Sequence, residues 1–120
     1  MRKRVSVFLS ISFFMVAFGA FAQSVVKTSV LIDADCAKKL GNDPAKIAEH
    51  KVSCLKTDAC KAAGYGIVVN GKFLKFDANG NNLIPNLLEK TQKAEDMKIR
   101  VNYDPQGEDS IYVFWILEAN

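Results

Sequence analysis

The chain has 120 residues, of which 49% are apolar and 24% are charged, and its mean hydropathy is +0.03. This length allows one domain and excludes two independent hydrophobic cores. The composition excludes a disordered chain and a Gly/Pro repeat, and the formal net charge is only +3.

The first 22 residues have the pattern of an export signal. Residues 2–4 are basic, an apolar run covers residues 5–21, and Ala-Phe-Ala at 20–22 supplies a small-x-small cleavage site. Serines and a glycine interrupt the run, whereas a membrane-spanning helix prefers about 20 strongly apolar positions. We therefore predict cleavage after Ala22 and a mature domain over residues 23–120. This domain is expected in the periplasm or secreted, without membrane attachment; a retained membrane anchor is the alternative.

Removal of this leader changes the charge of the protein. All 13 acidic residues and 13 of the 16 basic residues lie after position 22, so the mature domain is formally neutral. Proteins that bind phosphate backbones need a basic surface. We therefore expect no nucleic-acid partner.

The first half of the mature domain predicts a strand followed by a helical segment. Residues 25–33 alternate between apolar and polar side chains, which indicates a half-buried strand. Asn-Asp-Pro at 42–44 is a helix start, with an Asp cap before a proline at the first helical position. One helix is expected over 45–54, and a second short turn ends at Gly64. Residues from about 36 to 64 therefore form a helical insert.

The second half predicts two hairpins separated by a helix. Residues 65–70 and 72–77 flank Asn70-Gly71, the preferred pair for a two-residue type I′ turn. Leucines recur at helical spacing over residues 83–93. Further strands are expected over 97–103 and 110–117.

The last of these strands is apolar on both faces. Strict alternation places Ile111, Val113, Trp115 and Leu117 on one face, and Tyr112, Phe114 and Ile116 on the other. Such a strand is expected to be central in its sheet or covered by a helix.

The order of these elements is strand, helical insert, hairpin, helix, hairpin. Five strands with a helix between the third and fourth is the order of the OB-fold, a small Greek-key barrel. Closing the sheet also removes edges that would promote aggregation. We predict a mainly β, five-stranded OB-like barrel, with an open five-stranded sheet covered by a helix as the alternative.

Several short motifs run along the mature domain. They are His50-x3-Cys54-x5-Cys60, Gly64-Tyr65-Gly66 and the run Gly71-Lys72-Phe73-Leu74-Lys75-Phe76-Asp77. In this order they resemble a family of small exported bacterial proteins without an established activity, over nearly all of the mature chain. The resemblance implies an OB-like barrel in the periplasm or outside the cell. A wider similarity to periplasmic stress-associated OB-fold proteins implies binding of small ligands. The chain departs from the family pattern at residues 102–105, where a V-x-V-x-G strand is usual.

The cysteines and the single histidine are the main candidates for chemistry. Three cysteines in an exported chain leave at least one thiol free, paired between chains or bound to a metal. The favoured hypothesis is one disulfide and a spare thiol among Cys36, Cys54 and Cys60. A Cys36–Cys60 bond would close a 25-residue loop, a stabilisation of roughly 3 kcal/mol.

Two other hypotheses use the same residues. His50 and Cys54 are four apart and would share one face of a helix, so with Cys36 and Cys60 they could hold zinc or copper. A redox-active thiol pair is the third hypothesis, although the chain has no Cys-x-x-Cys motif. Asp33 and Asp35, which flank Cys36, are expected in a solvated loop.

Aromatic side chains could form the platform on which OB-folds stack bases or sugars. The candidates for this ligand face are Tyr65, Phe73, Tyr112 and Phe114, although such residues more often belong to a core. The run Asp77-x-Asn79-x-Asn81 lacks the glycine and glutamate of a calcium loop at their required positions, so it predicts a turn.

These observations favour a non-enzymatic protein. With one histidine and no nucleophile partnered to a base, acyl and phosphoryl transfer lack their required groups. We expect an exported binding or envelope-stress module for an unknown small ligand, with its site near the helical insert and the mouth of the barrel. The alternatives are a periplasmic copper- or zinc-binding protein and a thiol-redox protein.

Overall fold

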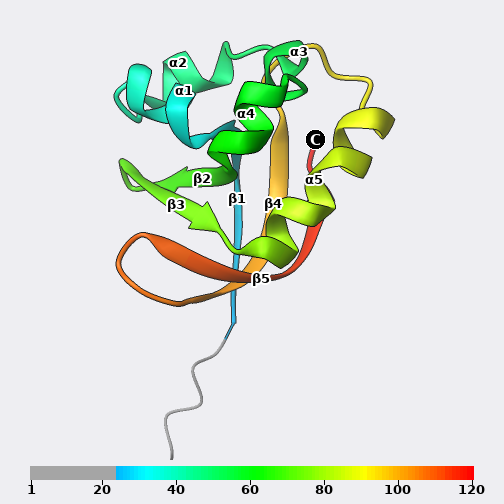
Figure 1. Ribbon diagram of the computed structural model, residues 1–120. Coiled ribbons are helices and arrows are strands. Elements are labelled where there is room, and N and C mark those ends of the chain that lie inside the picture. The colour runs from blue at the N-terminus through cyan, green and yellow to red at the C-terminus, as the bar shows by residue number, and fades with distance from the viewer. Residues whose placement is uncertain (1–23) are drawn as a thin grey trace, which may run out of the picture.

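Five strands close into a barrel with a group of helices at one end (Figure 1). The computed structural model describes residues 24–120, so the predicted leader lies outside the described residues. The strands are β1 (Val25–Asp33), β2 (Tyr65–Val69), β3 (Lys72–Phe76), β4 (Lys98–Pro105) and β5 (Ser110–Glu118). Within residues 24–120, no helix has the length and apolar character needed to cross a membrane.

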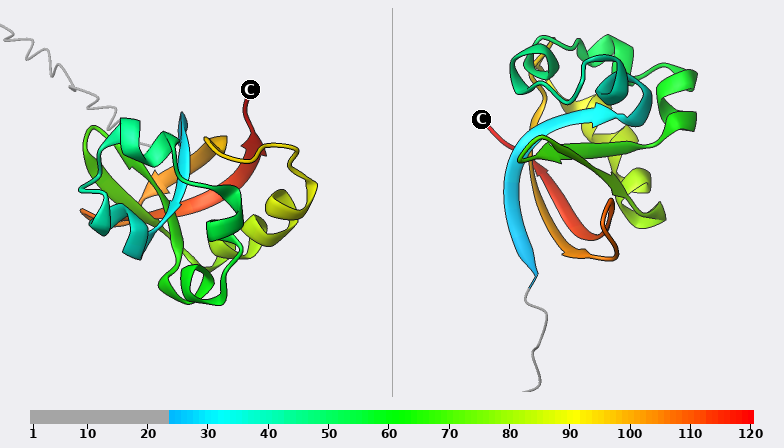
Figure 2. Two further views of the ribbon diagram at one scale, coloured as in Figure 1. Left: turned by 90° about the horizontal axis from the view of Figure 1, so that it is seen from above. Right: turned by 90° about the vertical axis from the view of Figure 1, so that its left-hand side faces the viewer.

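The strand order around the barrel is β1-β2-β3-β5-β4. Neighbouring strands are antiparallel except β3 and β5, which run parallel. β1 bends so that its first part pairs with β4 and its last part with β2, as its curved path in Figure 2 shows. This closed order confirms the predicted OB-like barrel and excludes the open sheet.

Four short helices form the insert between β1 and β2: α1 (Ala34–Lys39), α2 (Pro44–Ala48), α3 (Val52–Leu55) and α4 (Asp58–Ala63). Asp33, Asp43 and Thr57 cap three of them by accepting backbone N–H groups. The predicted start at Asp43-Pro44 is confirmed. The single helix expected over 45–54 is wrong, because α2 ends at Ala48 and α3 begins only at Val52. His50 therefore lies between two helices.

The helix α5 (Ala78–Lys90) joins β3 to β4 and begins earlier than predicted. The expected turn at 77–82 is in fact its cap and first turn, because the Asp77 side chain accepts the Gly80 N–H at 3.1 Å. Pro85 consequently lies inside the helix. Gly80 allows the helix to approach β5 closely, since a Cβ atom there would lie 2.7 Å from the Val113 side chain.

The barrel interior holds the main core, which includes Ile67, Val101 and Ile111 from the strands and Ile84 and Leu88 from α5. A second, smaller cluster of Ile32, Ala37 and Ile47 packs beneath the insert. The Asn70-Gly71 turn has positive φ at both residues, as the predicted type I′ hairpin requires.

The last strand departs from the strict alternation that the sequence predicted. Tyr103 of β4 pairs with Val113, but the neighbouring Asn102 pairs with Trp115, so Phe114 is an extra, bulged residue. Beyond the bulge the inward and outward positions exchange. Ile116 is buried, whereas Tyr112, Phe114, Trp115 and Leu117 are exposed. The assignment of Trp115 and Leu117 to the face of Val113 is therefore wrong. β5 does lie between β3 and β4, with α5 packed against Val113, as expected for a central or helix-covered strand, but its other face is exposed.

Candidate functional site

The start of the insert brings two cysteines together at the end of β1. Asp33 caps α1, and its Oδ2 accepts the N–H of Cys36 at 3.0 Å. Thr57 caps α4 and accepts the N–H of Cys60 at 3.3 Å. One carboxylate oxygen of Asp33 and the two Sγ atoms consequently lie within 4.8 Å of one another. We call these three residues the Asp-Cys-Cys group.

The Asp-Cys-Cys group is largely shielded from solvent. Asp33 is fully buried, Cys60 is 7% exposed and Cys36 is half-buried. The Oδ1 atom of Asp33 has no nitrogen or oxygen donor, and only the thiols of Cys36 and Cys60 lie beside the carboxylate. A buried carboxylate oxygen without a partner is costly, so this atom requires a physical explanation. The solvated loop expected around Asp33 is wrong.

Both thiols of the group are difficult to ionise. Burial raises the pKa of Cys36 from 9.0 to about 12, and the hydrogen bond and negative charge of Asp33 add to the effect. Burial also raises the pKa of Cys60, although its hydrogen bond with Thr57 acts in the opposite direction. Reactive cysteines instead have lowered pKa values. The arrangement therefore gives no support to a nucleophilic or redox-active thiol.

The four-residue metal set expected from the sequence is divided between two places. Cys36 and Cys60 belong to the Asp-Cys-Cys group, whereas Cys54 is exposed. His50 and Cys54 line a separate hollow of about 520 Å³ on the insert. Sequence reasoning missed Asp33 as a possible ligand, although its position three residues before Cys36 is a helix-cap spacing that could have indicated the contact.

The same geometry bears on the predicted disulfide. The sequence left the pairing among the three cysteines open, and Cys36 and Cys60 are the two that the fold brings together. In the structure all three cysteines are free thiols. The exposed Cys54 is therefore the odd cysteine that a Cys36–Cys60 pairing would leave over.

The four aromatic candidates are also divided. Tyr65 is 2% exposed, and its hydroxyl donates to the Leu55 carbonyl inside the core, so it cannot form a ligand face. Phe73 is half-buried against the small cluster beneath the insert. Tyr112 and Phe114 remain exposed, with their rings edge to face and their centroids 5.1 Å apart.

Trp115, Leu117 and Val26 are further exposed apolar residues of the same sheet, and we call the five residues together the aromatic face. Exposure of its five members ranges from 37% for Trp115 to 55% for Leu117. The members are Val26, Tyr112, Phe114, Trp115 and Leu117. Because Val26 pairs with Asn102 and Asn102 pairs with Trp115, these three side chains form one row across β1, β4 and β5.

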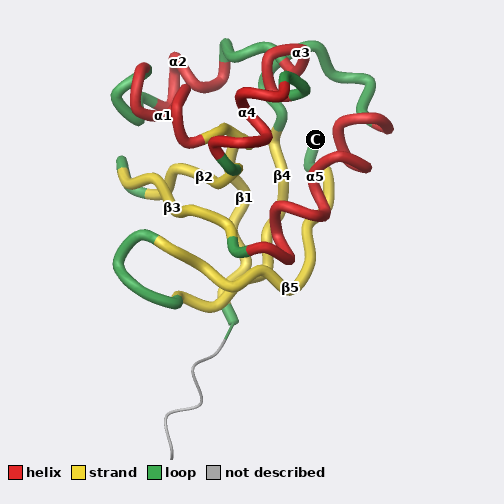
Figure 3. The backbone as a smooth tube through the Cα atoms, viewed as in Figure 1, coloured by secondary structure: helices red, strands yellow, loops and turns green. Residues whose placement is uncertain are grey.

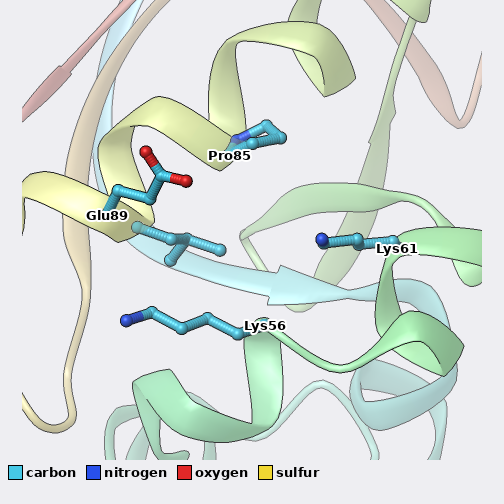
Figure 4. Close-up of a pocket in the computed structure, with 5 residues that line it drawn as sticks. Lys56, Lys61, Pro85 and Glu89 are labelled. Carbon is cyan, nitrogen blue, oxygen red and sulfur yellow. The ribbon is translucent and has the colours of Figure 1, made fainter.

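Three hollows lie elsewhere on the molecule. One of about 140 Å³ is lined by Lys56, Lys61, Pro85, Leu88 and Glu89, where the insert approaches α5 (Figure 4). Another of about 380 Å³ lies between the insert and residues 93–95. With the hollow beside His50, all three adjoin the helical end of the barrel, and none of them is lined by a residue of β5.

Comparison with protein-family models, with curated proteins and with solved structures found no match. The resemblance to small exported bacterial proteins therefore stays a prediction that rests on the sequence motifs.

Proposed function

We propose that this protein is an exported, non-enzymatic binding module that holds a saccharide chain on its aromatic face. The observation that carries the proposal is the exposed edge-to-face pair of Tyr112 and Phe114 beside Trp115. Large apolar side chains gathered on a surface usually mark an interaction site. Aromatic rings in particular can stack against the apolar face of a sugar ring, as they do against bases.

The polar residues of the same sheet face favour a saccharide. Cross-strand pairing places Asn102 beside Trp115, Arg100 beside Leu117 and Asp104 beside Tyr112. Directly paired residues point to the same side of a sheet, so the exposed Arg100 and the half-buried Asp104 lie among the apolar side chains, whereas Asn102 is only 9% exposed. Sugars need this combination, because each ring has an apolar face and a rim of hydroxyl groups.

Charge and shape argue against two other ligand classes. The mature domain is formally neutral, which gives no electrostatic attraction for a nucleic acid. Small-molecule sites are concave and bury most of their ligand, whereas the three hollows described above lie away from β5. An extended ligand suits the aromatic face better than a compact small molecule does, because none of the three hollows is lined by β5. The proposal thus moves the site from the insert, where the sequence placed it, to the outer face of β5.

Export is part of the proposal. Support comes from the basic start, the apolar run and the small-x-small motif, which together predict cleavage after Ala22. Intact mass measurement of the protein recovered from the periplasm or the medium tests this directly. A chain beginning at Gln23 is expected, and a full-length chain in the membrane fraction would contradict it.

The binding experiment can use a reporter within the site, because Trp115 is the only tryptophan in the chain. We expect soluble tetrasaccharides of N-acetylglucosamine or glucose to change its fluorescence in a saturable way. A single-stranded oligothymidine should leave it unchanged. The Phe114→Leu variant should bind at least about fivefold more weakly, since stacking on one aromatic ring contributes about 1–3 kcal/mol.

The matched control is Phe73→Leu, which makes the same exchange at an aromatic residue packed beneath the insert. It should leave the affinity unchanged. Equal weakening by both variants, or no fluorescence change with either sugar, would reject saccharide binding. Concentration-dependent sedimentation of the free protein, abolished by Phe114→Leu, would instead assign the aromatic face to self-association.

A further inference from the structure

The buried oxygen of Asp33 distinguishes the Asp-Cys-Cys group from an ordinary helix cap. Oδ2 performs the capping, because it accepts the Cys36 N–H at 3.0 Å. Oδ1 has no nitrogen or oxygen donor although the residue is fully buried, and only the two thiols, which are weak donors, lie beside the carboxylate. A disulfide between Cys36 and Cys60 would supply no hydrogen-bond donor to this atom. A bound cation would satisfy it.

The distances within the group suit one small metal ion. Zinc binds thiolate sulfur at about 2.3 Å and carboxylate oxygen at about 2.0–2.2 Å, so two sulfur ligands of a tetrahedral site lie about 3.8 Å apart. The three ligand atoms lie within 4.8 Å of one another, so shifts of an ångström or less would complete the site. These residues come from the end of β1, from α1 and from α4.

We propose that Asp33, Cys36 and Cys60 form a zinc site, with Oδ1 of Asp33 and the two sulfur atoms as three of its four ligands. The fourth position is left for water or an external ligand, since Cys36 is only half-buried. Binding releases one proton from each thiol to the solvent, so two thiolates and a carboxylate surround the divalent ion.

The ligand chemistry selects zinc over cuprous copper. Thiolate and thioether sulfur favour cuprous copper, and a carboxylate adds little to such a site. Zinc accepts sulfur and carboxylate oxygen together. The site proposed here also differs from the set expected from the sequence, because His50 and Cys54 take no part in it.

Cobalt provides a spectroscopic test, because it occupies zinc sites and shows a charge-transfer absorption when thiolates bind it. Titration of the reduced mature protein should give one cobalt ion per chain, with that absorption, and zinc should displace it. Cys36→Ser and Cys60→Ser should each weaken binding at least about tenfold. Asp33→Asn keeps a capping oxygen but removes the charge, and it should weaken binding by a similar factor.

Cys54→Ser is the matched control, because it removes the exposed thiol and should leave metal affinity unchanged. A second measurement needs no variant: zinc should protect Cys36 and Cys60 of the wild-type protein from alkylation while Cys54 still reacts. The proposal fails if the reduced protein binds no stoichiometric metal, or if Cys54→Ser or His50→Ala abolishes binding. It also fails if the exported protein is isolated with a Cys36–Cys60 disulfide and no metal. Unchanged affinity in Asp33→Asn would remove Asp33 from the site.

Discussion

The Asp-Cys-Cys group and the aromatic face depart from normal protein architecture in opposite ways. At the insert, a charged side chain is fully buried and one of its oxygens lacks a nitrogen or oxygen donor. On β5, large apolar side chains are 37–55% exposed. Folding alone favours neither arrangement, because buried charges and exposed apolar patches both weaken stability or solubility. Departures of this kind are expected at functional sites.

The two regions also differ in what surrounds them. The Asp-Cys-Cys group lies among the helices of the insert. The aromatic face lies mainly on β5, and the loop that joins β4 to β5 projects away from the insert (Figure 3). Ligand binding at the first region should therefore alter the stability of the fold. Ligand binding at the second should depend on surface side chains that the fold does not need.

The largest expected effect is stabilisation by zinc. A ligand that binds only the folded state at one hundred times its Kd stabilises that state by about 2.7 kcal/mol. Urea unfolding of the reduced protein with and without zinc measures this difference. We expect Cys60→Ser to lose the stabilisation and Cys54→Ser to keep it. Equal stabilisation of both variants would show that the metal binds elsewhere.

Removal of the Asp77 carboxylate should have the next largest effect. Its Oδ1 accepts the N–H groups of Gly80 and Val113, and so ties the start of α5 to β5 beneath the aromatic face. Asp77→Ala removes a helix cap and leaves a strand N–H unsatisfied, which should lower the free energy of unfolding by about 2 kcal/mol. Asp77→Asn keeps an acceptor and should lose less. Chemical denaturation distinguishes the two variants.

Alkaline pH should produce a smaller loss of stability in the reduced, metal-free protein. The pKa of Cys36 is raised from 9.0 to about 12 in the folded state. Above pH 9 the unfolded chain loses this proton while the folded protein keeps it, so stability falls as the pH rises from about 9 towards about 12. The urea midpoint of the wild type should be lower at pH 9.5 than at pH 8. The same difference should be smaller in Cys36→Ser. An equal decrease in both would contradict the assignment.

The smallest effect on stability should come from the aromatic face itself. Tyr112 and Phe114 are 40% and 45% exposed, and surface substitutions outside special contacts usually change stability by about 0.5 kcal/mol or less. Phe114→Leu should therefore unfold close to the wild type while losing saccharide affinity. A loss of several kcal/mol would indicate that the bulge depends on the phenylalanine ring, and that the face is structural.

Local signals in the sequence predicted much of the fold. The Asn70-Gly71 turn, the Asp43-Pro44 helix start and the order of the elements all depend on neighbouring residues, and the structure confirms them. The start of α5 was missed because Asp77 and the asparagines after it favour turns and helix caps alike. The N–H of Val113, which is distant in the sequence, also donates a hydrogen bond to Asp77, and no local pattern could show this contact.

The candidate sites were harder to predict because each depends on tertiary structure. The burial of Asp33 follows from the packing of α1 and α4 over the end of β1, which no local pattern shows. The exposure of Trp115 follows from a bulge whose position is set by pairing with β4. The sequence left open which of the three cysteines are neighbours, and only the fold brings Cys36 and Cys60 together, whereas His50 was placed on a helix that ends before it.

The extra residue in β5 has a consequence for redesign of this protein. Deleting Phe114 would remove the bulge and leave unbroken pairing between the last two strands, because Val113 would still pair with Tyr103 and Trp115 with Asn102. Regular alternation from Val113 would then keep Trp115 and Leu117 on the outer face and Ile116 in the interior, as they are in the wild type. The extra residue thus places one more aromatic ring on the surface, directly beside the indole, without disturbing the register that buries Ile116.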